Sequence, residues 1–100
     1  MHVIAKPILV TFWTKHPAAA TALQAWYRIM TSQDFNDFHS LRSIFASADV
    51  VDGLTVFNLG GNKYRLIASI HYNRRKTYIR QILTHTEYNH GKWKIRRPHG

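Results

Sequence analysis

Five side chains in the second half of the sequence could together act on a phosphodiester: Lys63, Arg65, Arg80, His85 and Tyr88. A histidine and a phenol can transfer protons. Cations can hold a phosphate and the negative charge that develops on it, and arginine does so through a planar, bidentate fork. The residue types therefore predict proton transfer at an anionic phosphate group.

RNA brings its own nucleophile to such chemistry, the 2′-hydroxyl next to the scissile phosphate. A base removes the proton of this hydroxyl, cations stabilise the crowded phosphorane, and an acid protonates the departing 5′-oxygen. His85 is the first choice for proton transfer, because a helix N-terminus and nearby cations favour a neutral imidazole. Tyr88, three positions later on the same helix face, could stack on a base or share the proton transfer. The residues leave open which group is the base and which is the acid.

Metal-assisted cleavage would require carboxylates to hold a divalent cation. Between residues 61 and 100 the only acid is Glu87, and its position three residues after Thr84 suits a helix cap. His85 and His90 lack a standard spacing of metal ligands. We therefore expect neither a metal nor a cofactor.

The net positive charge of the chain is confined to its second part. Residues 1–60 carry four Lys/Arg and four Asp/Glu, whereas residues 61–100 carry ten Lys/Arg and one acid, which accounts for the net charge of +9. These cations are interleaved with strand-forming residues, so they predict a basic sheet that binds nucleic acid. The cations expected to attract RNA without taking part in the chemistry are Arg74, Arg75, Lys76, Lys92 and Lys94.

The composition predicts one domain over residues 1–100, in which about 90–100 form a basic tail that either stays flexible or adds an edge strand. The absence of cysteine excludes disulfides, a thiolate nucleophile and a cysteine-based zinc site, and it fits a reducing cytosol. No apolar run approaches the roughly 20 residues that a bilayer requires. We expect a cytoplasmic protein with no membrane attachment.

The elements that must position these side chains follow from the hydrophobic period, which changes near Asp52-Gly53. Before this point we expect a short strand at 2–5, a helix after Pro7, a helix from Pro17 to about Thr31, and a short third helix through Leu41, Ile44 and Phe45, capped within 34–37. After it we expect strands at 54–59, 62–72 and 77–83, joined by a two-residue Gly60-Gly61 turn and a polar turn at 73–76. Helices followed by an antiparallel meander predict an α+β fold with the N-terminal helices on one face of the sheet.

The strand and helix boundaries predict where the candidate residues meet. Thr84-His85-Thr86-Glu87 has the form of a capping box, so a short C-terminal helix should begin at His85. Alternation along the 62–72 strand puts Lys63 and Arg65 on one face, and the opposite face suits the core. Whether Arg80 shares that face depends on register, which the sequence does not fix. These placements predict a phosphate pocket at one end of the sheet.

The motifs at these positions give the chain a family resemblance. The most specific pair is Gly60-Gly61-Asn62-Lys63-Tyr64-Arg65-Leu66 and Thr84-His85-Thr86-Glu87-Tyr88 at this separation. With them the chain resembles the HigB toxins of bacterial type II toxin–antitoxin systems, members of the RelE-like superfamily, over nearly its whole length up to about Asn89. The other matching stretches are Met1-His2-Val3-Ile4, Phe12-Trp13, His16-Pro17, Ala25-Trp26-Tyr27, Val56-Phe57-Asn58 and Tyr78-Ile79-Arg80.

The resemblance implies a RelE-like fold and an endoribonuclease, or mRNA interferase, that cuts mRNA in the ribosomal A site. It also implies neutralisation by a cognate HigA-like helix-turn-helix antitoxin, so that the protein would contact DNA only indirectly, through the antitoxin complex. The family pattern matches here at Lys63, Arg65, Arg80, His85 and Tyr88.

Two alternatives to this reading remain open at the level of sequence. The same basic sheet would serve a non-catalytic module that binds RNA or the ribosome. It would also serve an inactive toxin that acts as a structural partner of a DNA-binding antitoxin. Replacing His85 or Arg65 separates a nuclease from either, since only a nuclease has cleavage to lose.

Overall fold

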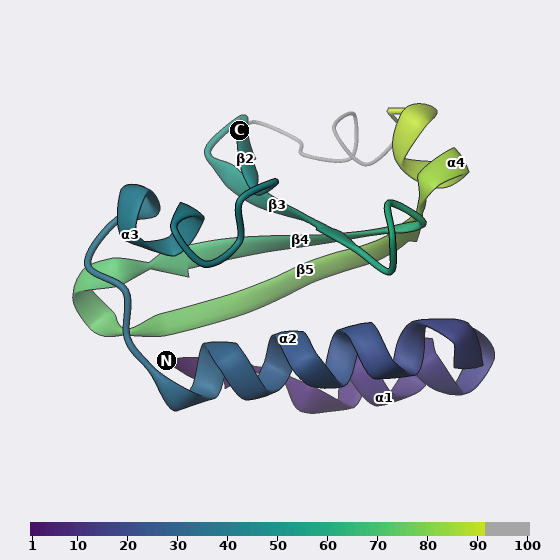
Figure 1. Cartoon of the computed structure of the whole chain (residues 1–100), viewed down its shortest axis with the longest axis horizontal. Coiled ribbons are helices and arrows are strands. Elements are labelled where there is room, and N and C mark those ends of the chain that lie inside the picture. The colour runs from purple at the N-terminus through teal and green to yellow at the C-terminus, as the bar shows by residue number, and fades with distance from the viewer. Residues whose placement is uncertain (92–100) are drawn as a thin grey trace.

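A five-stranded sheet organises the part of the chain that this computed structural model describes, residues 1–91 (Figure 1). Its strands are β1 His2–Ile4, β2 Asp49–Val51, β3 Leu54–Leu59, β4 Tyr64–His71 and β5 Lys76–Thr84. They are ordered β1-β5-β4-β3-β2, and β1 runs parallel to β5 while the other neighbours are antiparallel. The predicted meander of β3, β4 and β5 is confirmed. The sheet is nevertheless mixed, because β1 joins its edge in parallel, and the strand β2 was not predicted.

The helices are α1 Lys6–Lys15, η1 Pro17–Ala19, α2 Ala20–Ser32, α3 Phe38–Arg42, η2 Tyr72–Arg74 and α4 His85–Asn89, where η marks a 3₁₀ turn. Figure 1 shows α1 and α2 side by side against one face of the sheet, with α4 at one end of it. This arrangement confirms the predicted α+β class with N-terminal helices on one face and a short C-terminal helix. Within residues 1–91, no helix is both long and apolar enough to cross a bilayer.

Proline and short polar side chains set the helix boundaries. Pro7 occupies the first turn of α1, and Pro17 opens the 3₁₀ turn before α2, where a missing backbone N–H costs nothing. Asp37 caps α3 by accepting from the backbone N–H of Ser40 across 2.8 Å. The helix ends at Arg42, so Phe45, which was expected inside it, lies beyond its end and packs its ring on Phe57 at 5.0 Å.

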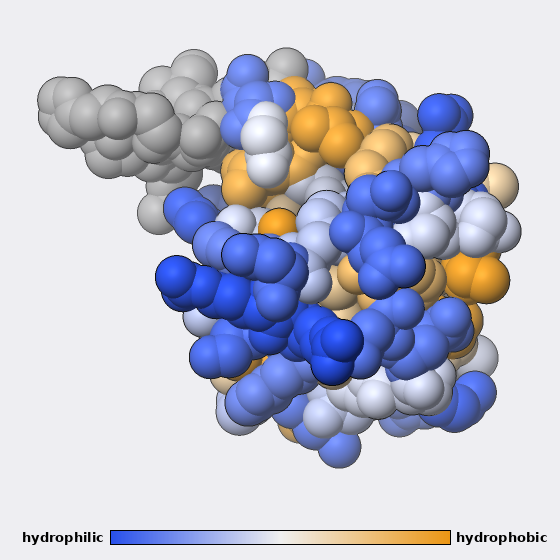
Figure 2. Space-filling view, turned by 90° about the vertical axis from the view of Figure 1, so that its left-hand side faces the viewer, coloured by the Kyte–Doolittle hydropathy of each residue, from blue (hydrophilic) through white to orange (hydrophobic). Residues whose placement is uncertain are grey.

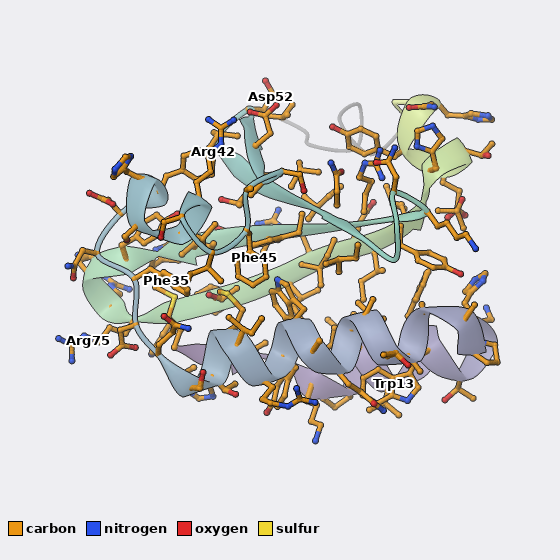
Figure 3. All side chains as sticks on the ribbon, viewed as in Figure 1. Trp13, Phe35, Arg42, Phe45, Asp52 and Arg75 are labelled. Carbon is orange, nitrogen blue, oxygen red and sulfur yellow. The ribbon has the colours of Figure 1, made fainter. Side chains whose placement is uncertain are left out.

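The main core lies between the helices and the sheet. Leu23, Trp26 and Met30 repeat at helical spacing on α2 and are buried there, and the Trp26 ring meets Phe57 of β3 edge to face at 5.5 Å. Figure 3 labels two further aromatic side chains, Phe35, which is buried in this core, and Phe45, which packs against it. A second, smaller cluster of buried side chains comprises Leu54, Val56 and Ile67, with Val51, Leu83 and Tyr88 packed against it.

The two clusters lie on opposite faces of β4. Tyr64, Leu66 and Ala68 belong to the main core, so the alternating positions Arg65 and Ile67 face the other way. We call the face away from α1 and α2 the outer face. The predicted separation of Arg65 from the core face of its strand is therefore confirmed.

The loop between β3 and β4 differs from the predicted two-residue turn. Leu59 pairs with Tyr64, so the loop comprises residues 60–63. Gly60, Gly61 and Asn62 all have positive φ, at 62°, 63° and 77°, and the loop closes with a bond from the Lys63 N–H to the Gly60 carbonyl at 3.4 Å. Three successive left-handed residues need this longer connection, and glycine adopts that conformation without steric cost.

The turn between β4 and β5 carries exposed cations. η2 is followed by Arg75, whose φ is 57°, and β5 then begins at Lys76, which confirms the predicted position of the turn. Arg75 is labelled at the end of the molecule in Figure 3, and Figure 2, which faces this end, shows a largely hydrophilic surface. Its guanidinium pairs with Asp34 at 3.6 Å while its side chain remains 72% exposed, so solvent screens the pair.

Candidate active site

Arg65 is a buried cation at the start of β4, with only 7% of its surface exposed. Its Nη1 donates to the carbonyls of Asn62 and Tyr64, at 3.1 and 3.2 Å, and its Nη2 lies 3.1 Å from Nδ1 of His85. A buried charge of this kind is tolerated because hydrogen bonds replace its lost hydration. The β3–β4 loop and the strand itself thus fix the guanidinium.

His85 is the first residue of α4, and the predicted capping box holds it there. The Thr84 hydroxyl accepts from the Glu87 N–H at 3.2 Å, and the Glu87 carboxylate accepts from the Thr84 N–H at 2.9 Å. The backbone N–H of His85 also donates to the carbonyl of Lys63 across 2.8 Å. The capping box and the backbone hydrogen bond to Lys63 together fix the imidazole beside the start of β4.

The contact with Arg65 determines which nitrogen of His85 carries the proton. Arginine has donors only, so Nδ1 must present its lone pair and the ring proton lies on Nε2. The side-chain amide nitrogen of Asn89, Nδ2, lies 3.0 Å from Nε2. An amide nitrogen can only donate, so with the proton on Nε2 the Asn89 amide must turn by 180° to present its oxygen as the acceptor.

Asn89 was not among the residues singled out from the sequence. The signal that could have found it is its position four residues after His85, which places it on the same helix face. A histidine whose second nitrogen is held by a neighbour has a fixed orientation and tautomer. Asn89 is therefore part of the site's geometry.

Tyr88 and Lys63 complete the cluster. The Arg65 guanidinium lies over the Tyr88 ring, 5.3 Å from its centroid, in a cation–π arrangement. Tyr88 also packs against the outer-face cluster of Leu54, Val56 and Ile67, so its ring has a packing role as well. Lys63 is exposed and lies beside His85 through their backbone bond.

The structure thus brings four of the five predicted site residues together at one end of the sheet: Lys63, Arg65, His85 and Tyr88. Arg80 lies elsewhere, further back along β5. At about 3.3 Å per residue, the five positions from Arg80 to His85 span at most about 16 Å. Arg80 is exposed and lines a separate pocket on the outer face.

The structure describes three of the five cations that were predicted to attract RNA. Arg74 is exposed on η2, Arg75 pairs with Asp34, and Lys76 begins β5 opposite His71. Lys92 and Lys94, together with the possible edge strand in the tail, lie outside the described residues. Across residues 1–91, no group of three or more His, Asp or Glu side chains is arranged to hold a metal ion.

This arrangement pairs a proton-transfer group with a fixed cation. One imidazole with a defined tautomer lies within hydrogen-bonding distance of a guanidinium, and a phenol and an exposed ammonium-bearing residue border them. Such a set can move a proton and stabilise negative charge on a phosphate. It is the pairing that metal-independent cleavage of RNA requires.

Comparison with known proteins yields one family and a group of close relatives. A family model, described as the HigB toxin, the RelE-like toxic component of a toxin–antitoxin system, matches residues 19–91. The chain is 35% identical to the mRNA interferase toxin HigB of Escherichia coli K12 over 92 residues, which cover 89% of this chain and 88% of that protein. It is 35% identical over the same coverage to the mRNA interferase HigB of Shigella flexneri. The corresponding protein of Escherichia coli O6:H1 is 30% identical, with 89% of each chain covered.

Proposed function

The chain belongs to the HigB family of RelE-like toxins, and we propose that it cuts mRNA in the ribosomal A site by metal-independent attack of the 2′-hydroxyl. Its function is that of a toxin in a toxin–antitoxin system, and it is an endoribonuclease that cleaves mRNA. The observation that supports the proposed mechanism best is the contact between Arg65 and His85. It joins a cation and a proton-transfer group from two different elements of the fold.

The proposed reaction forms one bond to phosphorus and breaks another. The 2′-oxygen attacks the phosphate, the bond to the 5′-oxygen breaks, and the products are a cyclic phosphate and a 5′-hydroxyl. His85 takes the proton of the 2′-hydroxyl on Nδ1, and a second group returns a proton to the 5′-oxygen. Tyr88, one helical turn away on α4, is the side chain of the cluster best suited to that second role.

Arg65 links substrate binding to this step. In the free protein its Nη2 occupies the lone pair of Nδ1, which the base must have available. We propose that an incoming phosphate draws Nη2 away from Nδ1, so that one movement frees the base and places a donor on the phosphate oxygen. The two bonds from Nη1 to backbone carbonyls keep the guanidinium in place during this exchange. Lys63, exposed beside His85, adds a second cation for the phosphate.

Dependence on the ribosome has a physical rationale. A domain of 100 residues offers little surface for gripping a flexible mRNA. Correct positioning of the reacting groups can lower a barrier by about 7–11 kcal/mol, and an external scaffold can supply it. The exposed cations Arg74 and Arg75, with the half-buried Lys76 beside them, suit a surface that docks against ribosomal RNA.

Membership in the family implies two binding partners for this chain. mRNA is its target, and an antitoxin is its protein partner. We propose that the antitoxin is a HigA-like helix-turn-helix protein and that the pair acts in the cytoplasm, where translating ribosomes are found. Contact with DNA would then pass through the antitoxin.

Primer extension on a defined mRNA, translated with purified ribosomes, tests the proposal. Discrete in-frame cuts should occur with ribosomes and be absent from naked mRNA treated with the same protein. The His85→Ala variant should bind ribosomes while its cleavage falls by about 10²–10⁴. Cuts on naked mRNA would instead indicate a self-sufficient ribonuclease, and ribosome binding without any cuts would indicate a non-catalytic module.

A further inference from the structure

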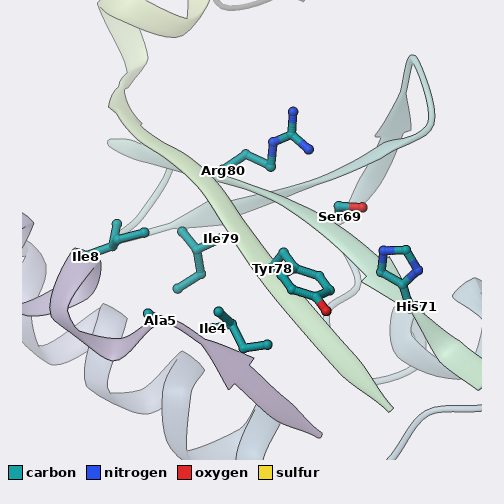
Figure 4. A pocket seen from close by; sticks show the side chains of 8 residues that line it. All are labelled: Ile4, Ala5, Ile8, Ser69, His71, Tyr78, Ile79 and Arg80. Carbon is teal, nitrogen blue, oxygen red and sulfur yellow. The ribbon is translucent and has the colours of Figure 1, made fainter. Parts of the chain in front are cut away.

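A pocket of about 460 Å³ lies on the outer face, near the edge of the sheet where β1 pairs with β5, and it is separate from the His85 cluster (Figure 4). Its volume falls within the range of small-molecule sites. The residues that line it are Ile4, Ala5, Ile8, Ser69, His71, Tyr78, Ile79 and Arg80.

The two flanks of this pocket differ in chemistry. In Figure 4 the side chains of Ser69, His71 and Arg80 stand along one flank, and three isoleucines stand along the other. Tyr78 lies between them, with its ring edge to face against His71 at 5.3 Å. Arg80 and His71 can bind an anion, the Ser69 hydroxyl can donate or accept, and the apolar flank with Tyr78 can cover a flat, uncharged ring. None of the eight lining residues is acidic.

An irregularity in the sheet lies at Arg80, beside this pocket. Ile67 pairs with Gln81 and Ala68 pairs with Ile79, so Arg80 is the extra residue of a β-bulge. Bulges of this kind re-aim a side chain and are common beside active sites. Tyr78 faces outward opposite Ser69, whereas Ile82, four positions later, packs against the main core, and the extra residue accounts for this change of face. Counted from Tyr78, Arg80 falls on the outer face, where its side chain is exposed.

The pocket and the His85 cluster share the outer face of β4 and β5. Arg65 and Ser69 both belong to β4 and both point to that face, with Ser69 opposite Tyr78. The interval between Arg80 and His85 is at most about 16 Å, which a short single strand can span.

We propose that this pocket binds a nucleotide of the RNA substrate that flanks the cleaved one. Arg80 and His71 bind its phosphate, and the Tyr78 ring stacks on its base. Single-stranded nucleic acids are commonly held by such pairs of cations and aromatic rings. This inference rests on the proposed function in so far as RNA is the substrate, and it assigns Arg80 to binding of the strand and not to the reacting phosphate.

Titration of the ¹⁵N-labelled protein with nucleoside 5′-monophosphates, followed by NMR, tests the assignment without requiring cleavage. Signals of Ser69, His71, Tyr78 and Arg80 should shift with each nucleotide. Inorganic phosphate alone should shift them much less, because it lacks a base for Tyr78. Equal responses to phosphate and to nucleotides would reduce the pocket to a simple anion site and overturn the proposal. No response at these residues would overturn it as well.

Three variants sharpen the test. Arg80→Ala should weaken nucleotide binding by about tenfold or more, as expected for the loss of a charged hydrogen bond, and Tyr78→Leu should weaken it while keeping an apolar side chain. Arg28→Ala removes an exposed arginine from α2, on the other face, and should leave binding unchanged. His85→Ala should lower cleavage by about 10²–10⁴ but keep the pocket's response, so failure of the pocket proposal is distinguishable from failure of the proposed function.

Discussion

Nη2 of Arg65 and Nδ1 of His85 are 3.1 Å apart, and because arginine can only donate, the imidazole accepts at this nitrogen. The pair joins β4 to α4, two elements that meet only in the folded protein. It sets the tautomer of His85 and occupies the lone pair that a general base uses. In the mechanism that we propose, the site becomes competent for proton transfer when a phosphate competes for the guanidinium.

The first prediction is that Arg65 cannot be replaced by lysine. Lysine keeps the charge, but its single ammonium cannot reach two carbonyls and an imidazole with the planar fork that Arg65 uses. We expect Arg65→Lys to lower the cleavage rate on ribosomes by about 10²–10³, the usual loss for one transition-state donor. Arg28→Lys, an exposed exchange on α2, is the matched control. Thermal denaturation of both variants reports the folded fraction, and a wild-type cleavage rate for Arg65→Lys would show that charge alone is sufficient.

The second prediction concerns Asn89. Long-range ¹H–¹⁵N spectra should show His85 with its proton on Nε2, the tautomer that the Arg65 contact requires. Asn89→Ala removes one hydrogen bond to this nitrogen, and we expect a two- to tenfold lower cleavage rate, corresponding to about 0.5–1.5 kcal/mol. Asn73→Ala, at an exposed asparagine of η2, should leave the rate unchanged. Observation of the Nδ1-protonated form would contradict the assignment.

The third prediction separates the helix cap from the chemistry. Thr84→Ala removes the hydroxyl that accepts from the Glu87 N–H, so α4 should be less stable by about 1 kcal/mol. Cleavage should fall with it, since α4 carries His85 and Tyr88. Thr84→Ser keeps the hydroxyl and should retain both stability and cleavage. Hydrogen exchange of the amides in α4 measures the local effect, and unchanged exchange in Thr84→Ala would show that the cap does not hold the helix.

Much of the fold was predictable from sequence because its signals are local. Each of these signals depends on residues that are close in sequence. They are the helical spacing in α2, the capping box at Thr84 and the glycines of the β3–β4 loop. β1 and β2 have three residues each, too few to establish a period, so parallel pairing of β1 and the presence of β2 were not predictable.

The sequence was sufficient to select four residues that cluster in the structure, but not to predict all their contacts. Lys63, Arg65, His85 and Tyr88 were chosen by residue type and by a family pattern, and the register of β4 with β5 brings them together. The face of Arg80 depended on this register, which the sequence does not fix. The structure places Arg80 at a β-bulge five positions before His85, where it lines a separate pocket.

The fourth prediction compares two adjacent glycines. Gly60 and Gly61 have nearly the same φ, 62° and 63°, so the left-handed conformation destabilises an alanine at either position by about 1–2 kcal/mol. At Gly60 the new Cβ would also lie 2.8 Å from Cδ2 of the buried Tyr64, whereas at Gly61 it meets nothing within 4 Å. We therefore expect Gly60→Ala to lower the free energy of unfolding more than Gly61→Ala does. Equal losses in urea denaturation would mean that the Tyr64 ring moves aside without cost.

The last prediction concerns alkaline stability and Tyr72, whose ring packs against the main core. Burial raises the pKa of the Tyr72 phenol above its ordinary value of 10.0; the nearby Thr55 hydroxyl partly opposes this rise and the Asp37 carboxylate adds to it. The phenol oxygen is buried and has no hydrogen-bond partner among residues 1–91.

A phenol whose pKa is higher in the folded state than in the unfolded chain binds its proton more tightly when folded. Its contribution to stability is therefore complete below pH 10.0, the ordinary pKa, and is lost as the pH rises through the higher pKa of the folded state. We expect the free energy of unfolding to fall above pH 10.0 with a smaller slope in Tyr72→Phe than in the wild type. At neutral pH the variant should be at least as stable as the wild type, because it no longer buries an oxygen without a partner. Urea denaturation at a series of pH values measures both effects, with Tyr27→Phe as the control for loss of one tyrosine. An identical slope in Tyr72→Phe and the wild type would show that this phenol does not govern alkaline stability.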